Sequence, residues 1–313
     1  MLPMNDAQIA SPQQDYSVFG LRVRSSLPLP ELTTALGDAP ADVTITTGPI
    51  PEAAHAAPGL TSVDGALVLL IPNVGRYRIE SGDRITLDPD PDVPARNVRL
   101  FLFGSAFGAL LHQRGLLPLH ATAVEIDGSA FAFMGHSGAG KSTLAAWFHD
   151  NGQRILADDV CVVRFDAEGR AVACPGLPHL RLWPDAMDFT GRRTEDFRRS
   201  YVGADGELEK FDIPIAVGED VRPEAQLAAV YLLQRGICFA IEQLTGVAAA
   251  QAVFENTYRG SFLSAASARH SHWQSALRLV QTTDVFAATR EWSLDRLPDQ
   301  CRALLAHARS LVD

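Results

Sequence analysis

The stretch Gly135-His136-Ser137-Gly138-Ala139-Gly140-Lys141-Ser142 decides the fold of this chain. It follows a short apolar run, 130–134, that predicts a strand, and it precedes a run, 143–150, that predicts a helix. Glycines let such a loop curl tightly, so successive N–H groups and the helix dipole face one phosphate. The strand, loop and helix together predict an α/β fold built around a phosphate-binding P-loop.

The loop residues predict how a nucleotide is held. The Lys141 ammonium is expected to reach the β- and γ-phosphates, and the Ser142 hydroxyl is expected to ligate Mg²⁺. His136 occupies a loop position that many residue types tolerate. The residues expected to bind the nucleotide are Gly135, His136, Ser137, Gly138, Ala139, Gly140, Lys141, Ser142 and Thr143.

Lysine is rare in this chain. Of the 27 basic residues, only Lys141 and Lys210 are lysines, and the rest are arginines. A GC-rich genome that drifts lysine codons to arginine explains this bias. The lysines that survive then mark positions that need a compact ammonium, which a guanidinium does not replace. Lys210 is therefore either a functional cation or an ordinary surface residue.

Composition bounds the class of protein. The chain has 313 residues, 47% of them hydrophobic, which suffices for one large domain or two ordinary ones. The net charge of −10 argues against nucleic acid as the main partner. The longest apolar span, 100–111, is too short to cross a membrane, and no signal peptide is visible at the N-terminus. Four cysteines without metal spacing predict reduced thiols in a cytoplasmic protein.

Three segments are expected along the chain. Residues 1–15 are polar and predict a disordered N-terminus, and residues 16–94 predict a smaller β-rich α+β domain. Three aspartates and three prolines at 88–94 mark the boundary, so 95–313 becomes the P-loop domain. Strands are expected at 17–24, 42–47, 66–71, 76–79, 84–87, 121–126, 130–134, 153–157, 160–165, 227–234 and 285–288. Helices are expected at 95–113, 143–150, 244–256, 272–281 and 294–311.

Candidate catalytic residues lie on both sides of the P-loop. Asp158-Asp159 follows the apolar run 155–157, at the strand end where a Mg²⁺-binding carboxylate is expected beside a P-loop. Adjacent side chains of a strand point to opposite faces, so both serve one site only if the backbone turns here. His120 is either a satisfied core histidine or a group at the reacting phosphate. Arg181 either neutralises phosphate charge or faces solvent from a strand.

His120, the loop 135–142 and Ala157-Asp158-Asp159, in this order, resemble the catalytic domain of the HPr kinase/phosphorylase family. The resemblance covers about 117–165, and 210–214 is a weaker match to a lysine-bearing segment. The Glu-x-Arg-Gly signature of bacterial HPr kinases is missing downstream. The chain looks more like the divergent proteobacterial branch, some members of which resemble enzymes that phosphorylate a lasso-peptide precursor on its C-terminal serine.

The resemblance implies an HPr kinase-like P-loop fold, ATP and Mg²⁺ as cofactors, and transfer to a serine hydroxyl of a peptide or small protein. Asp158 would be the general base and Asp159 the metal-supporting residue, with the reverse order left open. His120 would lie close to the reacting phosphate, with Arg181 and Lys210 as further catalytic candidates. A small-molecule hydroxyl kinase and a non-catalytic nucleotide-binding regulator are the alternatives. The identity of the acceptor, the choice of ATP over GTP, phosphorylase activity, the role of the N-terminal domain and the oligomeric state, a homo-oligomer included, stay open.

Overall fold

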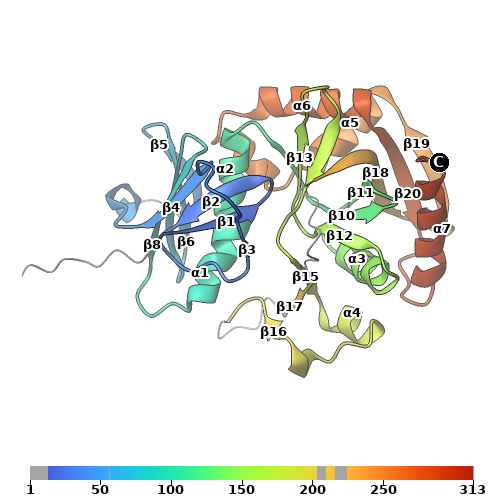
Figure 1. Cartoon of the computed structure of the whole chain (residues 1–313), viewed down its shortest axis with the longest axis horizontal. Coiled ribbons are helices and arrows are strands. Elements are labelled where there is room, and N and C mark those ends of the chain that lie inside the picture. Colours follow the sequence, from blue (N-terminus) through green and yellow to red (C-terminus); the bar gives the residue numbers. More distant parts are fainter. Residues whose placement is uncertain (1–12, 56, 203–208, 216–223, 313) are drawn as a thin grey trace, which may run out of the picture.

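The computed structural model describes residues 13–55, 57–202, 209–215 and 224–312. Figure 1 shows two sheet-centred units side by side, with a small sheet and the short helix α4 projecting below them. Helices and mixed sheets are combined in each part, so the expected α/β fold class is confirmed. Within the described ranges, no helix is long and apolar enough to cross a membrane.

The first unit is an eight-stranded sheet in the order β3-β1-β2-β4-β8-β7-β6-β5. Its strands are β1 (Gln14–Val18), β2 (Leu21–Ser25), β3 (Thr33–Thr34), β4 (Val43–Thr47), β5 (Gly59–Val63), β6 (Ala66–Ile71), β7 (Gly75–Glu80) and β8 (Arg84–Pro89). The single strand expected at 17–24 is wrong. Phe19 and Gly20 both have positive φ, 57° and 72°, and this turn separates β1 from β2. β1 also begins inside the segment expected to be disordered, of which residues 1–12 lie outside the described ranges.

One long helix packs against this first sheet. It comprises α1 (Ala95–Phe101), a π-helical turn η2 (Leu102–Ala106) and α2 (Phe107–Gln113). The Tyr77 hydroxyl on β7 donates a 2.8 Å hydrogen bond to the Val98 carbonyl, and the Phe19 and Phe107 rings lie 5.7 Å apart. The helix was expected at 95–113 but grouped with the P-loop domain. Its packing joins it to the first sheet.

The second unit contains a nine-stranded sheet in the order β12-β10-β11-β18-β14-β13-β9, with β20 beside β18 and β19 beside β20. Its strands are β9 (Leu117–Leu119), β10 (Ala121–Ile126), β11 (Ser129–Met134), β12 (Arg154–Ala157), β13 (Cys161–Phe165), β14 (Ala171–Cys174), β18 (Ala225–Arg235), β19 (Ala240–Leu244) and β20 (Asp284–Arg290). β10 and β11 form the expected hairpin. Asp127 and Gly128 at its turn have positive φ, as a type I′ turn requires.

Residue size along β11 decides which helices cover each face of this sheet. Phe131 and Phe133 point to one face and pack with α3 (Lys141–Asp150) and α7 (Leu297–Arg309). Ala130 and Ala132 alternate with them and face the other side. That side is covered by α5 (Gly246–Glu255) and α6 (Arg269–Thr282). The period of two in the sequence thus produces a sheet with helices on both faces.

Strand directions bring distant residues to one edge of the second sheet. β11 runs parallel to β18, and β18 runs parallel to β20. β12 also runs with β11, because both are antiparallel to β10. The carboxyl ends of β11, β12 and β20 therefore share an edge with the amino end of β10. This edge carries the P-loop, Asp158-Asp159, Arg290 and His120.

A third, small sheet lies below this edge in Figure 1 (yellow). It contains β15 (His179–Leu182), β17 (Phe211–Pro214) and β16 (Arg198–Arg199), in the order β15-β17-β16, with α4 (Pro184–Phe189) following β15. Pairing of β15 with β17 sets Arg181 opposite Asp212. The sheet therefore delivers charged side chains toward the P-loop edge from outside the main sheet.

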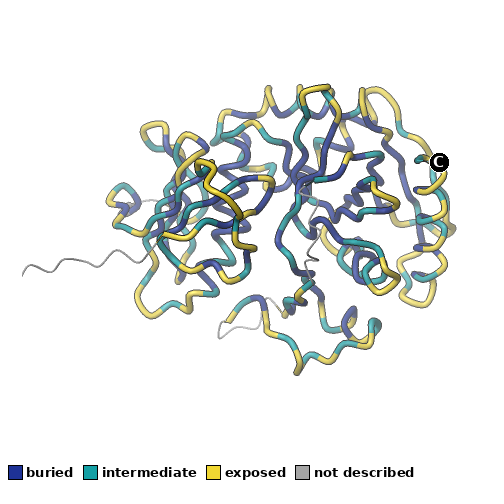
Figure 2. Tube along the Cα trace, viewed as in Figure 1, coloured by how far each residue is buried: buried dark blue, intermediate teal, exposed yellow. Residues whose placement is uncertain are grey.

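One buried hydrophobic cluster extends across the boundary between the two large units. The buried cluster around the first sheet and α1–α2 also includes Val160, Val162 and Tyr258 of the second unit. The Phe19 N–H donates a 2.7 Å hydrogen bond to the Pro175 carbonyl across the boundary. Figure 2 shows buried segments (dark blue) in the centre of both units and along the boundary between them. The candidate site is therefore built on a continuous, well-packed frame.

Candidate active site

The P-loop forms a tight turn at the start of α3. Gly140 has φ 78°, in the left-handed region, and α3 begins at the next residue, Lys141. The Lys141 ammonium is buried and donates hydrogen bonds to the Gly135 carbonyl at 2.7 Å and the His136 carbonyl at 3.1 Å. Burial lowers the pKa of Lys141 to about 8, although Asp159 and Asp158 favour its charged form.

His120 links Lys141 to the aspartate pair. Its Nε2 lies 3.0 Å from the Lys141 Nζ, and its Nδ1 lies 3.1 Å from the Asp159 carbonyl. Because an ammonium only donates, His120 Nε2 accepts and Nδ1 carries the proton. Burial and the Lys141 charge lower the pKa of His120. The imidazole is therefore neutral at pH 7, and its two nitrogens bridge Lys141 and Asp159.

Asp158 faces the P-loop serine and is buried. Its Oδ1 accepts hydrogen bonds from the Thr122 hydroxyl at 2.6 Å and the Ser142 hydroxyl at 3.1 Å. Its Oδ2 accepts a 3.0 Å hydrogen bond from the Arg181 N–H. Three donors thus fix both carboxylate oxygens against the start of α3.

Asp159 is only partly exposed and lines the cavity beside the P-loop. Its φ of 68° is the backbone turn that two adjacent aspartates need to serve one site. Its carboxylate lies 3.3 Å from His120 Nδ1 and 3.7 Å from the Arg181 guanidinium. Burial raises the pKa of Asp159, but Arg181, His120, Lys210 and Lys141 together outweigh it, and the net pKa is lowered. Asp159 is therefore an ionised carboxylate at pH 7.

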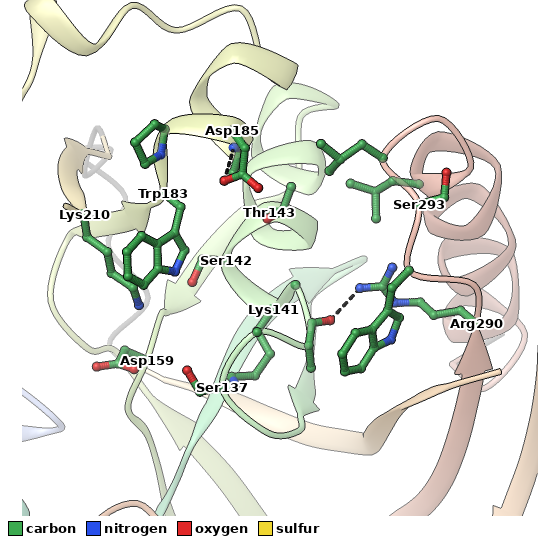
Figure 3. Close-up of a pocket in the computed structure, with 18 of the residues that line it drawn as sticks. Ser137, Lys141, Ser142, Thr143, Asp159, Trp183, Asp185, Lys210, Arg290 and Ser293 are labelled. Carbon is green, nitrogen blue, oxygen red and sulfur yellow. Dashed lines mark hydrogen bonds between the residues drawn. The ribbon is translucent and has the colours of Figure 1, made fainter. Parts of the chain in front are cut away.

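Arg181 and Lys210 reach the site from the small sheet. Arg181 is mostly buried, and its Nε lies 3.5 Å from an Asp212 oxygen. Lys210 lines the P-loop cavity, with its ammonium 5.5 Å from the centre of the Trp183 ring. Figure 3 shows Lys210, Trp183 and Asp159 on one side of this cavity. Both cations therefore lie beside the carboxylate of Asp159.

The P-loop borders a cavity of about 630 Å³. Residues 137–143 form its floor, and Figure 3 shows Arg290 across the cavity from Lys210. Trp183 and Trp292 line it as partly exposed aromatic walls. Its size and its mixture of cationic, hydroxyl and aromatic groups suit a nucleotide.

A second cavity, of about 420 Å³, lies on the other side of the His120–Asp159 pair. It shares His120, Ser137 and Asp159 with the first cavity, and Gly135 and His136 line it as well. The segment 255–259 forms its outer wall. Every residue expected to bind the nucleotide or act in catalysis thus lines one or both cavities, except Asp158 and Arg181, which contact residues that do.

Sequence reasoning missed Arg290, the last residue of β20. It is only 3% exposed, and its Nη2 donates a 2.6 Å hydrogen bond to the carbonyl of Ala139 in the P-loop. Its Nη1 donates to the Gln300 side chain at 3.2 Å, while its Nε has no partner. Among the described residues no carboxylate forms an ion pair with Arg290. The sequence offers only a weak indication of Arg290, which is an arginine at the end of an apolar strand about 150 residues after the P-loop.

Thr122, Trp183 and Trp292 were also missed. Thr122 orients Asp158 from the second position of β10, where a buried threonine has no distinguishing pattern. Trp183 and Trp292 follow β15 and β20, and both line the P-loop cavity. A tryptophan within two positions of a strand's end was the signal available for both.

The donor set fits Mg²⁺. The Ser142 hydroxyl and the Asp158 carboxylate lie 3.1 Å apart at the start of α3, and both are the oxygen ligands that Mg²⁺ prefers. Within the described ranges no group of three or more His, Cys, Asp or Glu side chains gathers around one metal position. Mg²⁺ commonly uses one or two carboxylates and completes its shell with water and substrate phosphates. The Ser142–Asp158 pair is therefore a sufficient protein contribution.

No family model and no curated protein sequence matches this chain. One solved structure similar to it is described as the Hpr(Ser) kinase/phosphatase from Coxiella burnetii. The two are 11% identical with a TM-score of 0.31, and the match covers 62% of this chain and 96% of the other. A likeness of this size does not establish membership of that family, so the chemistry must be argued from the site itself.

Proposed function

We propose that this chain is a Mg²⁺- and ATP-dependent phosphotransferase that transfers the γ-phosphate to a serine hydroxyl of a peptide or small protein. One observation carries the proposal. Lys141, His120 and Asp159 are linked where two cavities meet: residues 137–143 line the first cavity, and residues 135–137, at the start of the P-loop, line the second. A nucleotide on one side and an acceptor on the other would meet at Asp159.

The proposed nucleotide site uses the backbone of 135–140 and two cations. Lys141 would leave the loop carbonyls and bind the terminal phosphates, as the lysine of a P-loop does. Arg290, a buried guanidinium without a carboxylate partner, would supply further positive charge beneath the loop. Mg²⁺ held by Ser142 and Asp158 would neutralise charge on the β- and γ-phosphates.

We assign the general base to Asp159 and the metal-side role to Asp158, the reverse of the order first expected. The oxygens of Asp158 already accept three hydrogen bonds and face the Mg²⁺-binding serine. Asp159 is ionised and lines both cavities. It would accept the hydroxyl proton as the serine oxygen bonds to the γ-phosphorus and the bond from that phosphorus to the β-bridging oxygen breaks. The products are a phosphoserine ester and ADP.

The lowered pKa of Asp159 makes it a weak base, but phosphoryl transfer through a loose transition state asks little of a base. Orientation is therefore its main contribution. His120 and Arg181 would position the carboxylate, and Lys210 would neutralise charge on the phosphoryl group in transfer. Burial of Cys161, Cys174 and Cys301 is consistent with a reducing, cytoplasmic setting.

The order of His120, the loop and Ala157-Asp158-Asp159 supports an HPr kinase-like enzyme. The missing Glu-x-Arg-Gly signature is the reason to propose the branch that resembles lasso-precursor kinases. The test is transfer of label from γ-³²P-ATP with Mg²⁺ to HPr, to a lasso-type precursor peptide ending in serine, and to small hydroxyl compounds. We expect label on a polypeptide acceptor and none with Lys141→Met. Label on a small compound alone would favour the small-molecule kinase. Tight ATP binding without any transfer would favour the regulatory protein.

A further inference from the structure

We propose that the second cavity is the acceptor site and that Arg259 selects an acceptor whose hydroxyl lies near a carboxylate. This inference rests on the proposed function and deepens it by naming the chemistry of the acceptor. The cavity meets the P-loop cavity at His120, Ser137 and Asp159. A hydroxyl that enters from this side reaches Asp159 while a nucleotide fills the other cavity.

The outer wall of this cavity is held in place before any acceptor binds. The His120 N–H donates a 2.7 Å hydrogen bond to the Asn256 carbonyl, and the Tyr258 N–H donates to the Pro118 carbonyl at 2.9 Å. The buried Thr257 hydroxyl lies 2.7 Å from His272 Nε2. Hydrogen bonds thus connect the wall to β9 and to His120, which follows it. A preformed wall lowers the ordering cost of binding.

Arg259 is the one permanent cation among the described residues that line this cavity. It is exposed, and none of the described carboxylates forms an ion pair with it. Its guanidinium instead lies 5.6 Å from the centre of the Tyr258 ring and 5.8 Å from that of Phe262. A planar guanidinium that lies against aromatic rings and forms no ion pair with a described carboxylate is suited to bind an acceptor carboxylate through two parallel hydrogen bonds.

The backbone at Arg259 is held in an uncommon conformation. Its φ is 51°, in the left-handed region, where a non-glycine residue is destabilised by roughly 1–2 kcal/mol. Gly260, which follows, would adopt a left-handed conformation at little cost, yet it is Arg259 that has the positive φ. Strain of this kind clusters at ligand-binding positions. It fixes the direction in which the Arg259 side chain leaves the wall.

Tyr258 sets the spacing between the guanidinium and the reacting group. Its ring centre lies 6.0 Å from that of His120 and 5.6 Å from the Arg259 guanidinium carbon. These two contacts limit the separation to roughly three residues of extended chain, at ~3.5 Å per residue. The carboxylate should therefore lie within three residues of the accepting serine. The second carboxylate that lines this cavity, Glu255, accepts a 2.7 Å hydrogen bond from Gln251 on α5.

The experiment compares label transfer to matched serine peptides, with Mg²⁺-ATP and the full chain. One arm places Asp, Asn or Lys at each of the three positions on either side of the serine. A second arm compares a free with an amidated C-terminus, which separates a side-chain carboxylate from a chain end. We expect kcat/KM to favour one carboxylate source by tenfold or more over its amide.

Charge reversal by Arg259→Glu should remove this preference and favour the lysine peptides instead. Arg269→Glu is the matched control, because Arg269 is also exposed and stacked on an aromatic ring, 5.8 Å from the centre of Phe254, but lines neither cavity. It should keep the wild-type preference. Transfer without a carboxylate preference, or a preference unchanged in Arg259→Glu, would overturn this inference and leave the kinase standing. Transfer to no acceptor at all would overturn the proposed function and this inference with it.

Discussion

At the scale of single residues, the neutral imidazole of His120 connects the charged side chains of Lys141 and Asp159. Lys141 is buried, and its ammonium bonds to loop carbonyls and to His120. His120 in turn holds Asp159 through its other nitrogen. Filling the P-loop with phosphate would draw Lys141 toward the ligand and leave His120 and Asp159 facing the second cavity.

The lowered pKa of Lys141 predicts a pH dependence of ATP affinity. Bound phosphate favours the charged form of Lys141, so above pH 8 Lys141 takes up a proton when ATP binds. ATP affinity should be highest below the Lys141 pKa of about 8 and should fall as the pH rises through that value. At pH 9 about a tenth of the free protein is protonated at Lys141, so binding should be about tenfold weaker than at pH 7.

Calorimetric titration at constant Mg²⁺ from pH 7 to pH 9.5 measures this. Lys141→Met should bind ATP weakly, with no such slope. A wild-type affinity that stays constant over the whole range would remove Lys141 from its assigned contact.

Arg290 should contribute to binding more than to stability. Arg290→Met removes a cation beneath the P-loop, and we expect ATP affinity to fall by tenfold or more. The free energy of unfolding should change by less than about 1.5 kcal/mol, because the lost hydrogen bonds are offset by the relief of a buried, unpaired charge. Arg309→Met, at a surface ion pair with Asp127, is the control. Normal ATP affinity combined with a large loss of stability would make Arg290 a purely structural residue.

Asp158 should set the Mg²⁺ requirement. In Asp158→Asn the site keeps one oxygen beside Ser142 but loses the charge that attracts the cation. We expect the Mg²⁺ concentration for half-maximal transfer to rise about tenfold, corresponding to ~1.4 kcal/mol. Transfer rates measured across a Mg²⁺ series report this. An unchanged requirement would argue against the metal-side role of Asp158.

At the scale of elements, the two ends of α3 provide a matched pair of glycines. Gly140 precedes the helix with φ 78°, and Gly152 follows it with φ 81°. Alanine in this region costs roughly 1–2 kcal/mol at either position. At Gly140, however, the added Cβ would lie 2.6 Å from an Arg290 nitrogen, whereas nothing lies within 4 Å at Gly152.

Gly140→Ala should therefore lose ATP binding as well as stability, and Gly152→Ala should lose only stability. Melting temperatures and ATP titrations of the two variants distinguish these outcomes. Equal ATP affinities in both would show that the contact between Gly140 and Arg290 does not shape the loop.

Local patterns predicted the elements near the P-loop well. The hairpin of β10 and β11 follows from two apolar runs around Asp127-Gly128, and α3 follows from the loop before it. The single strand expected at 17–24 was wrong, because apolar residues recur on both sides of Phe19-Gly20 although the backbone reverses there. Gly20 was the turn signal available, but a lone glycine inside a strand-like run is also typical of a bulge.

At the scale of the whole molecule, what the sequence could not supply is the pairing of distant segments. Arg290 reaches the P-loop only because β20 runs parallel to β18, and β18 runs parallel to β11. The helix 95–113 is recognisable, but its packing against the first sheet is not, since both of its neighbours offer apolar surface. Such contacts depend on topology, which local periodicity does not encode.

The shared core predicts that the two units unfold together. Removing residues 1–94 would expose the face of α1–α2 that carries Phe103 and Phe107, both now buried. A fragment of residues 95–313 should therefore fail to unfold cooperatively, while the whole chain should show one transition by circular dichroism and by fluorescence. A stable fragment that binds ATP would instead support the division at residue 94.

Asp159→Asn tests the central claim, phosphoryl transfer at the junction of two cavities, most directly. The measurement is label transfer from γ-³²P-ATP together with ATP affinity, on wild type and variant at saturating Mg²⁺. We predict that transfer falls by at least about a hundredfold, because asparagine neither orients the serine hydroxyl through its proton nor accepts that proton, while ATP affinity changes less than about threefold. Near-normal transfer in Asp159→Asn would contradict the assignment of the reaction to this carboxylate.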